Sequence, residues 1–418
     1  MEVRFLAEKT PKRPLEGIRV LNLSWALFGP YCGMILTDLG AEVIKIERPV
    51  LGDQSRQWGP FFPNVQPPNN SGYYVSLHRG QKGITLNLKH PKGKEIFLKL
   101  VKISDVIVAN FRPGTLEEWG LGYDVLKEVN PRIIVALGSG FGQERYHPFV
   151  SPWASYPSYD IVGQAFGGFM ELNGWPDKPP CRAGSLIGDI IAGLFLTIGI
   201  LAALRWREIT GKGQLIDVAQ ADSILAAMEN AYIRYSISNE VPTRIGAKHP
   251  TIAPFDVFKA KDGWVVIGVG NDAIWRRFCQ AIGKPELIDD PRFKTNPDRC
   301  DHYDELKPIV EEWTSQRNKR DIWQTLVKYD IPSAPVYTMK DIDEDPHFEK
   351  RQMIVEIDQP PYGKVKIVGC PIKFSETPIT TEFFGPAPLL GQHTEEVLQQ
   401  LLGMSKEEIE QLRKEGVI

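Results

Sequence analysis

The chain has 418 residues, of which 42% are hydrophobic and 24% charged, and its formal net charge at pH 7 is −3. These values are typical of a soluble globular protein of two or three domains, and they argue against a dedicated nucleic-acid binder. The five cysteines are odd in number and include no Cys-x-x-Cys pair. We therefore expect no metal site, no disulfide framework and a reducing, cytoplasmic location, and the N-terminal residues lack the apolar core of a signal peptide.

The first 140 residues alternate between strand-like and helix-like segments. We expect strands over residues 18–23, 43–46, 84–88, 106–109 and 133–137, and helices over residues 30–39, 91–102 and 122–129. This order predicts an α/β fold with a large, doubly wound, Rossmann-like sheet whose ligand crevice lies at the carboxyl ends of the strands. Residues 49–72, rich in Pro, Gly, Asn and Gln, are predicted to form a long functional loop.

The second half begins with an uncharged run, residues 190–204, which is too short to span a bilayer and predicts a buried helix. A strand over 214–218 and a helix over 219–235 follow. A hairpin (255–258 and 264–268) and helices near 273–282, 304–314 and 319–328 then predict a smaller α+β domain. Strands near 352–357 and 364–368 and an amphipathic helical tail from residue 393 complete the pattern. We expect a large domain over 1–222, a linker over 223–250, the small domain over 251–345 and a return to the large domain over 346–418.

Asp189 stands directly before the uncharged run, at the expected mouth of its helix. Free backbone N–H groups and the helix dipole favour a carboxylate there, and the preceding Gly188 allows another group to approach closely. A carboxylate in this setting can act as a nucleophile, although an ordinary helix-capping aspartate is the alternative.

Four cations lie near the ends of the expected strands: Arg48, Arg79, Lys82 and Arg112. Each could be a solvated loop charge, but together they indicate an anionic ligand that carries phosphates. The chain has neither a GxGxxG after the first strand nor a GxxxxGK[ST] segment, so we expect neither a nicotinamide cofactor nor a P-loop nucleotide.

Two further groups suggest a place for the substrate. Gln164 could donate its amide to a substrate carboxylate, or simply belong to a helix that starts near Asp160. Aromatic side chains in and after the long loop could wall an acyl pocket or pack the loop itself: Trp58, Phe61, Phe62, Tyr73 and Tyr74.

An ordered set of segments, found along nearly the whole chain, resembles the class III coenzyme A (CoA) transferases, which include formyl-CoA transferase and carnitine CoA-transferase. The segments are LEGIRVL (15–21), AEVIKIER (41–48), NFRPG (110–114), GFGQ (140–143), YDIVGQA (159–165), GD (188–189), TGKGQ (210–214) and PLLGQHTEEVL (388–398).

The resemblance implies that Asp189 carries the acyl group and that Arg48, Asn110, Phe111 and the segment around Arg79 and Lys82 border the CoA nucleotide. It implies that acyl-CoA and a small carboxylic acid are substrates, with no permanently bound cofactor. The reaction would pass through an aspartyl anhydride and an aspartyl-CoA thioester, with backbone N–H groups at the helix start stabilising the oxyanions. The resemblance also implies an interlocked homodimer, and no nucleic-acid or membrane partner is expected.

Three residues depart from the family pattern: Gln81 replaces a common Lys, Glu118 a common basic residue, and Phe28 a commonly small one. The first two affect the phosphate contacts and Phe28 the pantetheine end. Residues 246–256 lack the glycine-rich lid of formyl-CoA transferase, which argues against a formyl/oxalate pair.

Two alternative functions share this fold. A racemase of 2-methylacyl-CoA esters would carry a His where this chain has Tyr159, and Gln164-Ala165 fits the transferases better. The chain could also be a subunit of a heteromeric CoA-transferase, although Asp189 argues against a non-catalytic one.

Overall fold

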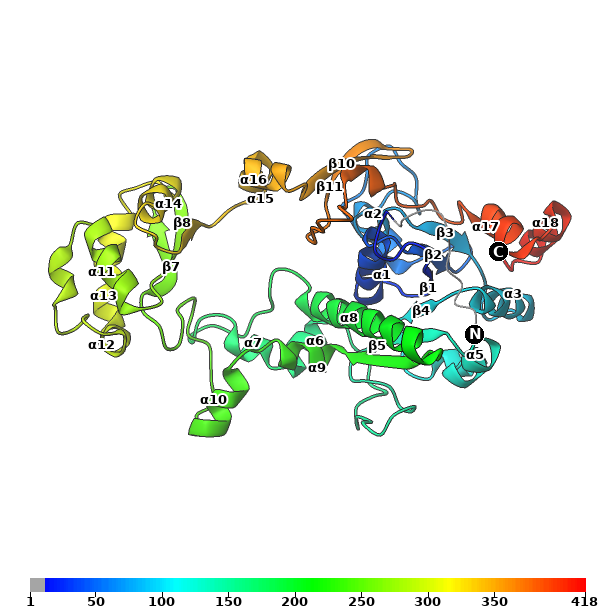
Figure 1. Cartoon of the computed structure of the whole chain (residues 1–418), viewed down its shortest axis with the longest axis horizontal. Helices are drawn as coiled ribbons and strands as arrows, with labels where there is room; N and C mark the ends of the chain where they lie inside the picture. Colours follow the sequence, from blue (N-terminus) through cyan, green and yellow to red (C-terminus); the bar gives the residue numbers. More distant parts are fainter. Residues whose placement is uncertain (1–11) are drawn as a thin grey trace. The chain divides into compact units, whose positions relative to one another are not determined.

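The computed structural model describes residues 12–418, and its chain folds into two compact units (Figure 1). Unit 1 comprises the chain as far as Phe169 together with Arg182–Tyr232 and Pro346–Ile418, and unit 2 comprises Met170–Cys181 and Ile233–Asp345. Residues 223–250, expected as a linker, are therefore divided between the two units.

A six-stranded parallel sheet forms the centre of unit 1, in the order β3-β2-β1-β4-β5-β6. Its strands are β1 (Arg19–Asn22), β2 (Glu42–Glu47), β3 (Lys82–Thr85), β4 (Val106–Ala109), β5 (Ile134–Ser139) and β6 (Leu215–Ala219). The order reverses between β1 and β4, and doubly wound sheets bind ligands at such a switch point, outside the carboxyl ends of the strands. The predicted α/β fold with a parallel, Rossmann-like sheet is confirmed.

Alternate residues of the strands face two separate cores, as the two-residue period of a strand requires. Val20 and Val106 belong to one core and their neighbours Leu21 and Ile107 to the other. The first core contains α1 (Phe28–Asp38) and α8 (Ile187–Thr210). The second contains α3 (Pro91–Lys102), α5 (Tyr123–Val129), α17 (Thr394–Leu402) and α18 (Lys406–Lys414). Helices therefore cover both faces of the sheet.

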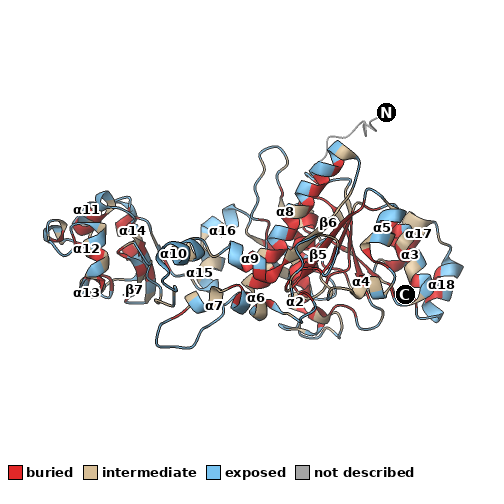
Figure 2. Ribbon diagram, turned by 90° about the horizontal axis from the view of Figure 1, so that it is seen from below, coloured by how far each residue is buried: buried red, intermediate tan, exposed pale blue. Residues whose placement is uncertain are grey.

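The apolar run forms the middle of α8, which has 24 residues and is longer than expected at both ends. Ala192, Leu196 and Ile200 are buried in the first core, whereas Ile198 is 59% exposed. Figure 2 shows buried and exposed residues along opposite sides of this helix. By length and composition α8 could cross a membrane, yet half of its most apolar window is buried within the protein. The expectation of a buried helix is thus wrong for one side, because a run that is apolar all round does not reveal which side packs.

The other elements of unit 1 connect or flank the sheet. They include η1 (Gln54–Gln57), α2 (Gly72–His78), α4 (Thr115–Glu118), α6 (Asp160–Phe166), α9 (Gln220–Ala226), α16 (Pro346–Lys350), the hairpin β10 (Ile354–Gln359) and β11 (Gly363–Val368), and η3 (Thr381–Phe383). The helix expected over 219–235 is broken into α9 and α10 (Ala231–Ser238), and the C-terminal tail is broken at Gly403, whose positive φ of 67° ends α17. α7 (Phe169–Leu172) crosses a unit boundary, as does α10.

Unit 2 is built on a three-stranded antiparallel sheet, β7 (Phe255–Ala260), β8 (Gly263–Gly268) and β9 (Ser333–Pro335). The predicted hairpin corresponds to β7 and β8. Its helical elements are α11 (Asp272–Ala281), η2 (Pro285–Ile288), α12 (Asn296–Asp301), α13 (Tyr303–Thr314), α14 (Lys319–Val327) and α15 (Met339–Glu344). Trp275, Phe278 and Phe293 lie in a core of its own, so an α+β unit is present where the sequence pattern changes.

Candidate active site

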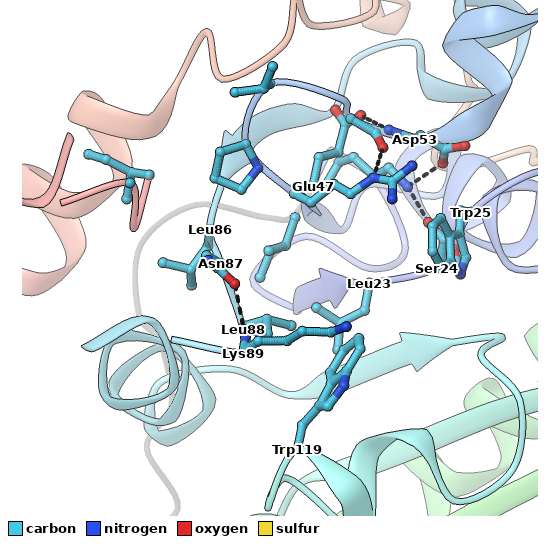
Figure 3. Close-up of a pocket in the computed structure, with 18 of the residues that line it drawn as sticks. Leu23, Ser24, Trp25, Glu47, Asp53, Leu86, Asn87, Leu88, Lys89 and Trp119 are labelled. Carbon is cyan, nitrogen blue, oxygen red and sulfur yellow. Dashed lines mark hydrogen bonds and ion pairs between the residues drawn. The ribbon is translucent and has the colours of Figure 1, made fainter. Parts of the chain in front are cut away.

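A cavity of about 720 Å³ opens at the carboxyl ends of β1 to β4 (Figure 3). Its walls come from the ends of these strands, from the segments that follow them and from the C-terminal residues: Leu23–Trp25, Lys45–Val50, Gly52, Asp53, Leu86–Lys89, Phe111, Trp119, Arg413, Gly416 and Ile418. The cavity therefore lies at the sheet edge where the sequence placed a ligand crevice. We call it the outer cavity.

Arg48 lies in the outer cavity, and three further cations, Lys45, Lys89 and Arg413, line it. Arg48 donates from Nε to the carbonyl of Gly52 at 3.1 Å, and its guanidinium carbon lies 5.5 Å from the centre of the Trp25 ring. These bonds leave both terminal nitrogens of Arg48 able to meet a phosphate. The outer cavity thus combines cations with an aromatic surface.

Phe111 also lines the outer cavity. The centre of its ring lies 5.4 Å from that of Trp25 and 5.1 Å from that of Trp119, both in edge-to-face arrangements. Arg112 lines a different, very small cavity beside Gly114. The chain turns away after Phe111, so the structure brings Phe111 to the crevice and not Arg112.

Arg79 and Lys82 do not reach the outer cavity, contrary to prediction. Arg79 is buried and donates from Nε to Asp38 at 2.9 Å, and Lys82 pairs with Glu42 at 3.2 Å and Glu396 at 3.0 Å. Both precede or begin β3, whose opposite end opens into the cavity. Because all six strands are parallel, the start of β3 lies at the other edge of the sheet. The residues that follow β3, Leu86–Lys89, line the cavity instead.

A second cavity of about 110 Å³, the inner cavity, contains Asp189. Trp25 lines both cavities. The inner wall is formed by residues at the start of α1, after β4, at the end of β5 and at other helix starts: Ala26, Phe28, Gln54, Asn110, Gly138–Gly140, Ser158, Tyr159, Asp189 and Gln220. The predicted nucleophile is thus accessible from a small cavity that shares a wall with the large one.

Asp189 lies in the first turn of α8 and is 9% exposed. Gln220, the first residue of α9, donates from Nε2 to Asp189 Oδ1. The carbonyl oxygen of Gln220 in turn accepts from the Ser158 hydroxyl at 2.6 Å. Sequence reasoning missed both Gln220 and Ser158, although Gln220 follows β6 directly and so stands at the carboxyl edge of the sheet.

The start of α8 is capped from α6. Asp160 Oδ1 accepts from the backbone N–H groups of Gly188 at 2.8 Å and Asp189 at 3.3 Å. Gln164 donates to Asp160 Oδ2 at 2.6 Å and accepts from the N–H of Ala183 at 2.9 Å. Two predictions are therefore corrected. The amide of Gln164 is committed to Asp160 rather than to a substrate, and Asp160 already occupies the helix-start N–H groups that were expected to stabilise oxyanions.

Burial, followed by the negative charge of Asp160, raises the pKa of Asp189, and the hydrogen bond from Gln220 opposes both effects; the net result is a pKa of about 7. Burial, followed by the charge of Asp189, raises the pKa of Tyr73 to about 12. Trp58 packs edge-to-face against Tyr73, with the ring centres 5.3 Å apart. It lines neither cavity, so the structure does not place it where it was predicted to meet the substrate. A carboxylate with a pKa near neutrality is more basic than an ordinary aspartate, which suits a nucleophile.

The remaining predicted residues shape the inner cavity. Tyr159, 67% exposed, lines it. Asn110, expected to border the CoA nucleotide, lines the inner cavity and not the outer one, and it holds the backbone of Trp25 through two hydrogen bonds, both 2.9 Å. Phe28 fills space that a side chain at position 138 would need, since a Cβ on Gly138 would lie 2.6 Å from the Phe28 ring. Of the other departures from the family pattern, Gln81 is buried and Glu118 exposed, and neither lines a cavity.

A buried ion pair fixes the turn that carries Trp25. Lys45 binds the carboxylate of Asp53 at 2.7 Å and the carbonyl oxygen of Ser24. The same carboxylate accepts from the N–H of Ala26 at 3.1 Å. The first part of the long loop is thus tied to both β1 and β2. Within residues 12–418, no group of three or more His, Cys, Asp or Glu side chains could hold a metal ion.

The chain is similar to known proteins along nearly its whole length. The family model for CoA-transferase family III matches residues 15–394. The succinyl-CoA–D-citramalate CoA-transferase of Chloroflexus aurantiacus is 37% identical, over 99% of this chain and 100% of its own length. The succinyl-CoA:mesaconate CoA-transferase of Haloarcula marismortui is 39% identical, over 92% of this chain and 96% of its own length. The crystal structure of a CAIB/BAIF family protein from Brucella suis superimposes with a TM-score of 0.81 at 35% identity, covering 93% of this chain and 99% of that one. The chain therefore belongs to CoA-transferase family III and is an enzyme that transfers CoA.

Proposed function

We propose that this enzyme moves CoA from an acyl-CoA thioester to a free carboxylic acid through covalent intermediates on Asp189. The observation that carries the proposal is the position of Asp189, a buried carboxylate at the wall of a small cavity that meets a large, cation-lined one at Trp25. A thioester whose nucleotide lies in the outer cavity could present its acyl carbon to Asp189 in the inner one.

The proposed reaction proceeds in two half-reactions. Asp189 Oδ2 attacks the acyl carbon, the C–S bond breaks, and CoA leaves as a thiolate, so that a mixed anhydride remains. The thiolate then attacks Cγ of Asp189, the acyl carboxylate leaves, and an aspartyl-CoA thioester forms. A second carboxylic acid reverses these steps and departs as the new acyl-CoA. One thioester replaces another, which explains how the reaction can run without ATP.

The CoA nucleotide is proposed to bind in the outer cavity. Arg48, Lys89 and Arg413 supply positive charge for the phosphates, and the rings of Trp25, Phe111 and Trp119 supply apolar surface. The pantetheine arm would pass Trp25, which is the one residue within 12–418 that lines both cavities. This position replaces the one around Arg79 and Lys82.

The acyl groups are proposed to be short dicarboxylic acids. The two relatives compared above are named for succinyl-CoA as donor and for citramalate or mesaconate as acceptor. The inner cavity of about 110 Å³ holds only a small group, and Phe28 narrows it. Gln54, Ser139 and Tyr159 offer neutral donors to a second carboxylate.

The test is covalent trapping on Asp189. Incubation with succinyl-CoA should add CoA to Asp189 in the native enzyme, detected by intact-mass and peptide mass spectrometry, and Asp189→Ala should abolish both the adduct and the transfer reaction. Asp321→Ala is the matched control, because Asp321 also lies in the first turn of a helix but is exposed in unit 2. Full transfer activity in Asp189→Ala would refute the covalent role of Asp189.

The assembly is proposed to be an interlocked homodimer in the cytoplasm. The exposed side of α8 carries large apolar residues that a second copy could cover, namely Leu194, Phe195, Ile198, Leu201, Trp206 and Ile209. All five cysteines are free, which suits a reducing compartment. Since one relative is the beta subunit of a succinyl-CoA–L-malate CoA-transferase from Chloroflexus aurantiacus, a heteromer is the alternative. A dimer of the purified chain that does not exchange subunits with a differently tagged pool would support interlocking, whereas a stable monomer would refute it.

A further inference from the structure

Among the described residues, Gln220 is the side chain that hydrogen-bonds the carboxylate of Asp189. Its Nε2 donates to Asp189 Oδ1, and it is only 5% exposed. Among the described residues of α9 it alone lines the inner cavity. The bond leaves Oδ2, the other oxygen of Asp189, as the atom that can attack an acyl carbon.

The amide of Gln220 is held in one orientation. The Ser158 hydroxyl donates to its carbonyl oxygen at 2.6 Å, which fixes the NH₂ group toward Asp189. Neighbouring glycines allow this packing: a Cβ on Gly163 would lie 2.8 Å from Cβ of Gln220, and a Cβ on Gly140 would lie 2.2 Å from Cβ of Ser158. A donor fixed before the reaction begins is worth more than one that must reorient.

Other donors near Asp189 are already engaged. The first N–H groups of α8 are all bonded: Ile187 to the carbonyl of Ser185, Gly188 and Asp189 to Asp160, and Ile190 to the carbonyl of Leu186. The helix start therefore orients Asp189 but has no N–H free for an oxyanion on its side chain. The amide of Gln220 is directed at one of the carboxylate oxygens.

We infer that Gln220 is a catalytic residue that stabilises the oxyanion formed when the CoA thiolate attacks Cγ of Asp189, with Ser158 as its positioning residue. This inference rests on the proposed function. In the mixed anhydride Oδ2 is bonded to the acyl carbon and Oδ1 is the carbonyl oxygen. Thiolate attack forms the C–S bond and moves an electron pair onto Oδ1, where Gln220 donates. Collapse returns the pair, breaks the Cγ–Oδ2 bond and releases the acyl carboxylate, with no proton transferred.

Gln220→Met tests the inference because methionine has nearly the same shape but no donor. Loss of one oxyanion donor slows catalysis by about 10²–10³-fold, so we expect the formation of the Asp189–CoA adduct, followed by rapid-quench mass spectrometry after mixing with succinyl-CoA, to slow by about that factor. The KM for succinyl-CoA should change little. Ser158→Ala should give a smaller decrease, because the amide is then free to rotate. Ser223→Ala is the control on the same helix, since Ser223 bonds only the carbonyl of Ala219 in the described structure.

The pH profile separates this role from a simple electrostatic one, because the hydrogen bond from Gln220 also favours the ionised form of Asp189. If Gln220 acts only by keeping Asp189 ionised, Gln220→Met should form the Asp189–CoA adduct at the native rate at pH 9. A rate that remains below the native rate at pH 9 supports the oxyanion role. Adduct formation at the native rate in Gln220→Met, with unchanged circular dichroism, would overturn this inference alone. Absence of an adduct in the native enzyme would overturn the proposed function and this inference with it.

Discussion

Replacing Asp189 by Asn should stabilise the protein, and the gain should depend on pH. Burial, together with the smaller effect of the negative charge of Asp160, raises the pKa of Asp189 from 3.8 to about 7. A difference of this size corresponds to about 4 kcal/mol, at about 1.4 kcal/mol per unit. Because the folded pKa is raised, the folded state binds the proton more tightly than the unfolded chain. The cost of an ionised Asp189 is therefore absent below about pH 4, grows between pH 4 and 7, and is complete above pH 7.

Asn keeps the size of the side chain and an oxygen that can accept from Gln220, so it removes the charge with little loss of packing. Chemical unfolding at fixed protein concentration should show Asp189→Asn more stable than the native enzyme by up to about 4 kcal/mol at pH 8 and nearly equal to it at pH 4. Asp321→Asn, in an exposed first turn, should change stability by less than about 1 kcal/mol at both pH values. If Asp189→Asn is no more stable than the native enzyme at pH 8, the ionised carboxylate of Asp189 does not destabilise the folded state and the prediction is refuted.

Three further predictions follow from named contacts. Arg48→Ala should raise the KM for both CoA-containing partners about tenfold or more, through loss of a charge-assisted contact worth about 1.5–3 kcal/mol; an effect on the acid alone would show that Arg48 is not in the CoA site. Asp160→Asn should move the acidic limb of the pH–rate profile for CoA transfer to lower pH, because the negative charge of Asp160 raises the pKa of Asp189. The double variant Asp160→Asn with Gln164→Glu restores the hydrogen-bond pattern and serves as the control. An acidic limb that does not move would contradict the effect of Asp160 on the pKa of Asp189. Arg56→Met should lower the free energy of unfolding at pH 8 by about 3–5 kcal/mol, because it leaves buried Glu47 without its cation. Arg205→Met breaks an exposed pair with Glu208 and should lower it by less than about 1 kcal/mol. Equal losses would show that burial of the ion pair does not decide its effect on stability.

Local signals predicted the elements best. Pro91 marked the start of α3, and the expected helix over 91–102 and strand over 106–109 match α3 and β4 residue for residue. Longer patterns were less reliable. The helix expected over 219–235 is interrupted between α9 and α10, and no helix is expected from the sequence at α2, which follows the loop-rich stretch after β2. Tertiary packing, which periodicity does not encode, decides such breaks.

The candidate active site shows the same contrast between local signals, which predicted well, and longer patterns, which did not. Asp189 was found because a helix mouth is a local feature, whereas its partners lie 29 and 31 residues away at Asp160 and Gln220. Gln220 could have been found by the rule that selected Arg48, since both lie at the carboxyl end of a strand. The same rule is wrong for Arg79 and Lys82, because these residues lie before and at the start of β3 and not at its carboxyl end.

The separation of charge between the two cavities explains why Asp189 can remain basic. Arg48, Lys89 and Arg413 line the outer cavity, where phosphates would neutralise them, and none of them lines the inner one. Lys45 and Arg56, the buried cations of the same sheet edge, are each paired with a carboxylate at 2.7 Å. The groups that set the pKa of Asp189 therefore include the like charge of Asp160 and no cation. An unpaired cation beside Asp189 would lower its pKa and weaken it as a nucleophile. The buried pairs Lys45–Asp53 and Arg56–Glu47 thus also neutralise two cations of this sheet edge, so that neither presents an unpaired positive charge to Asp189.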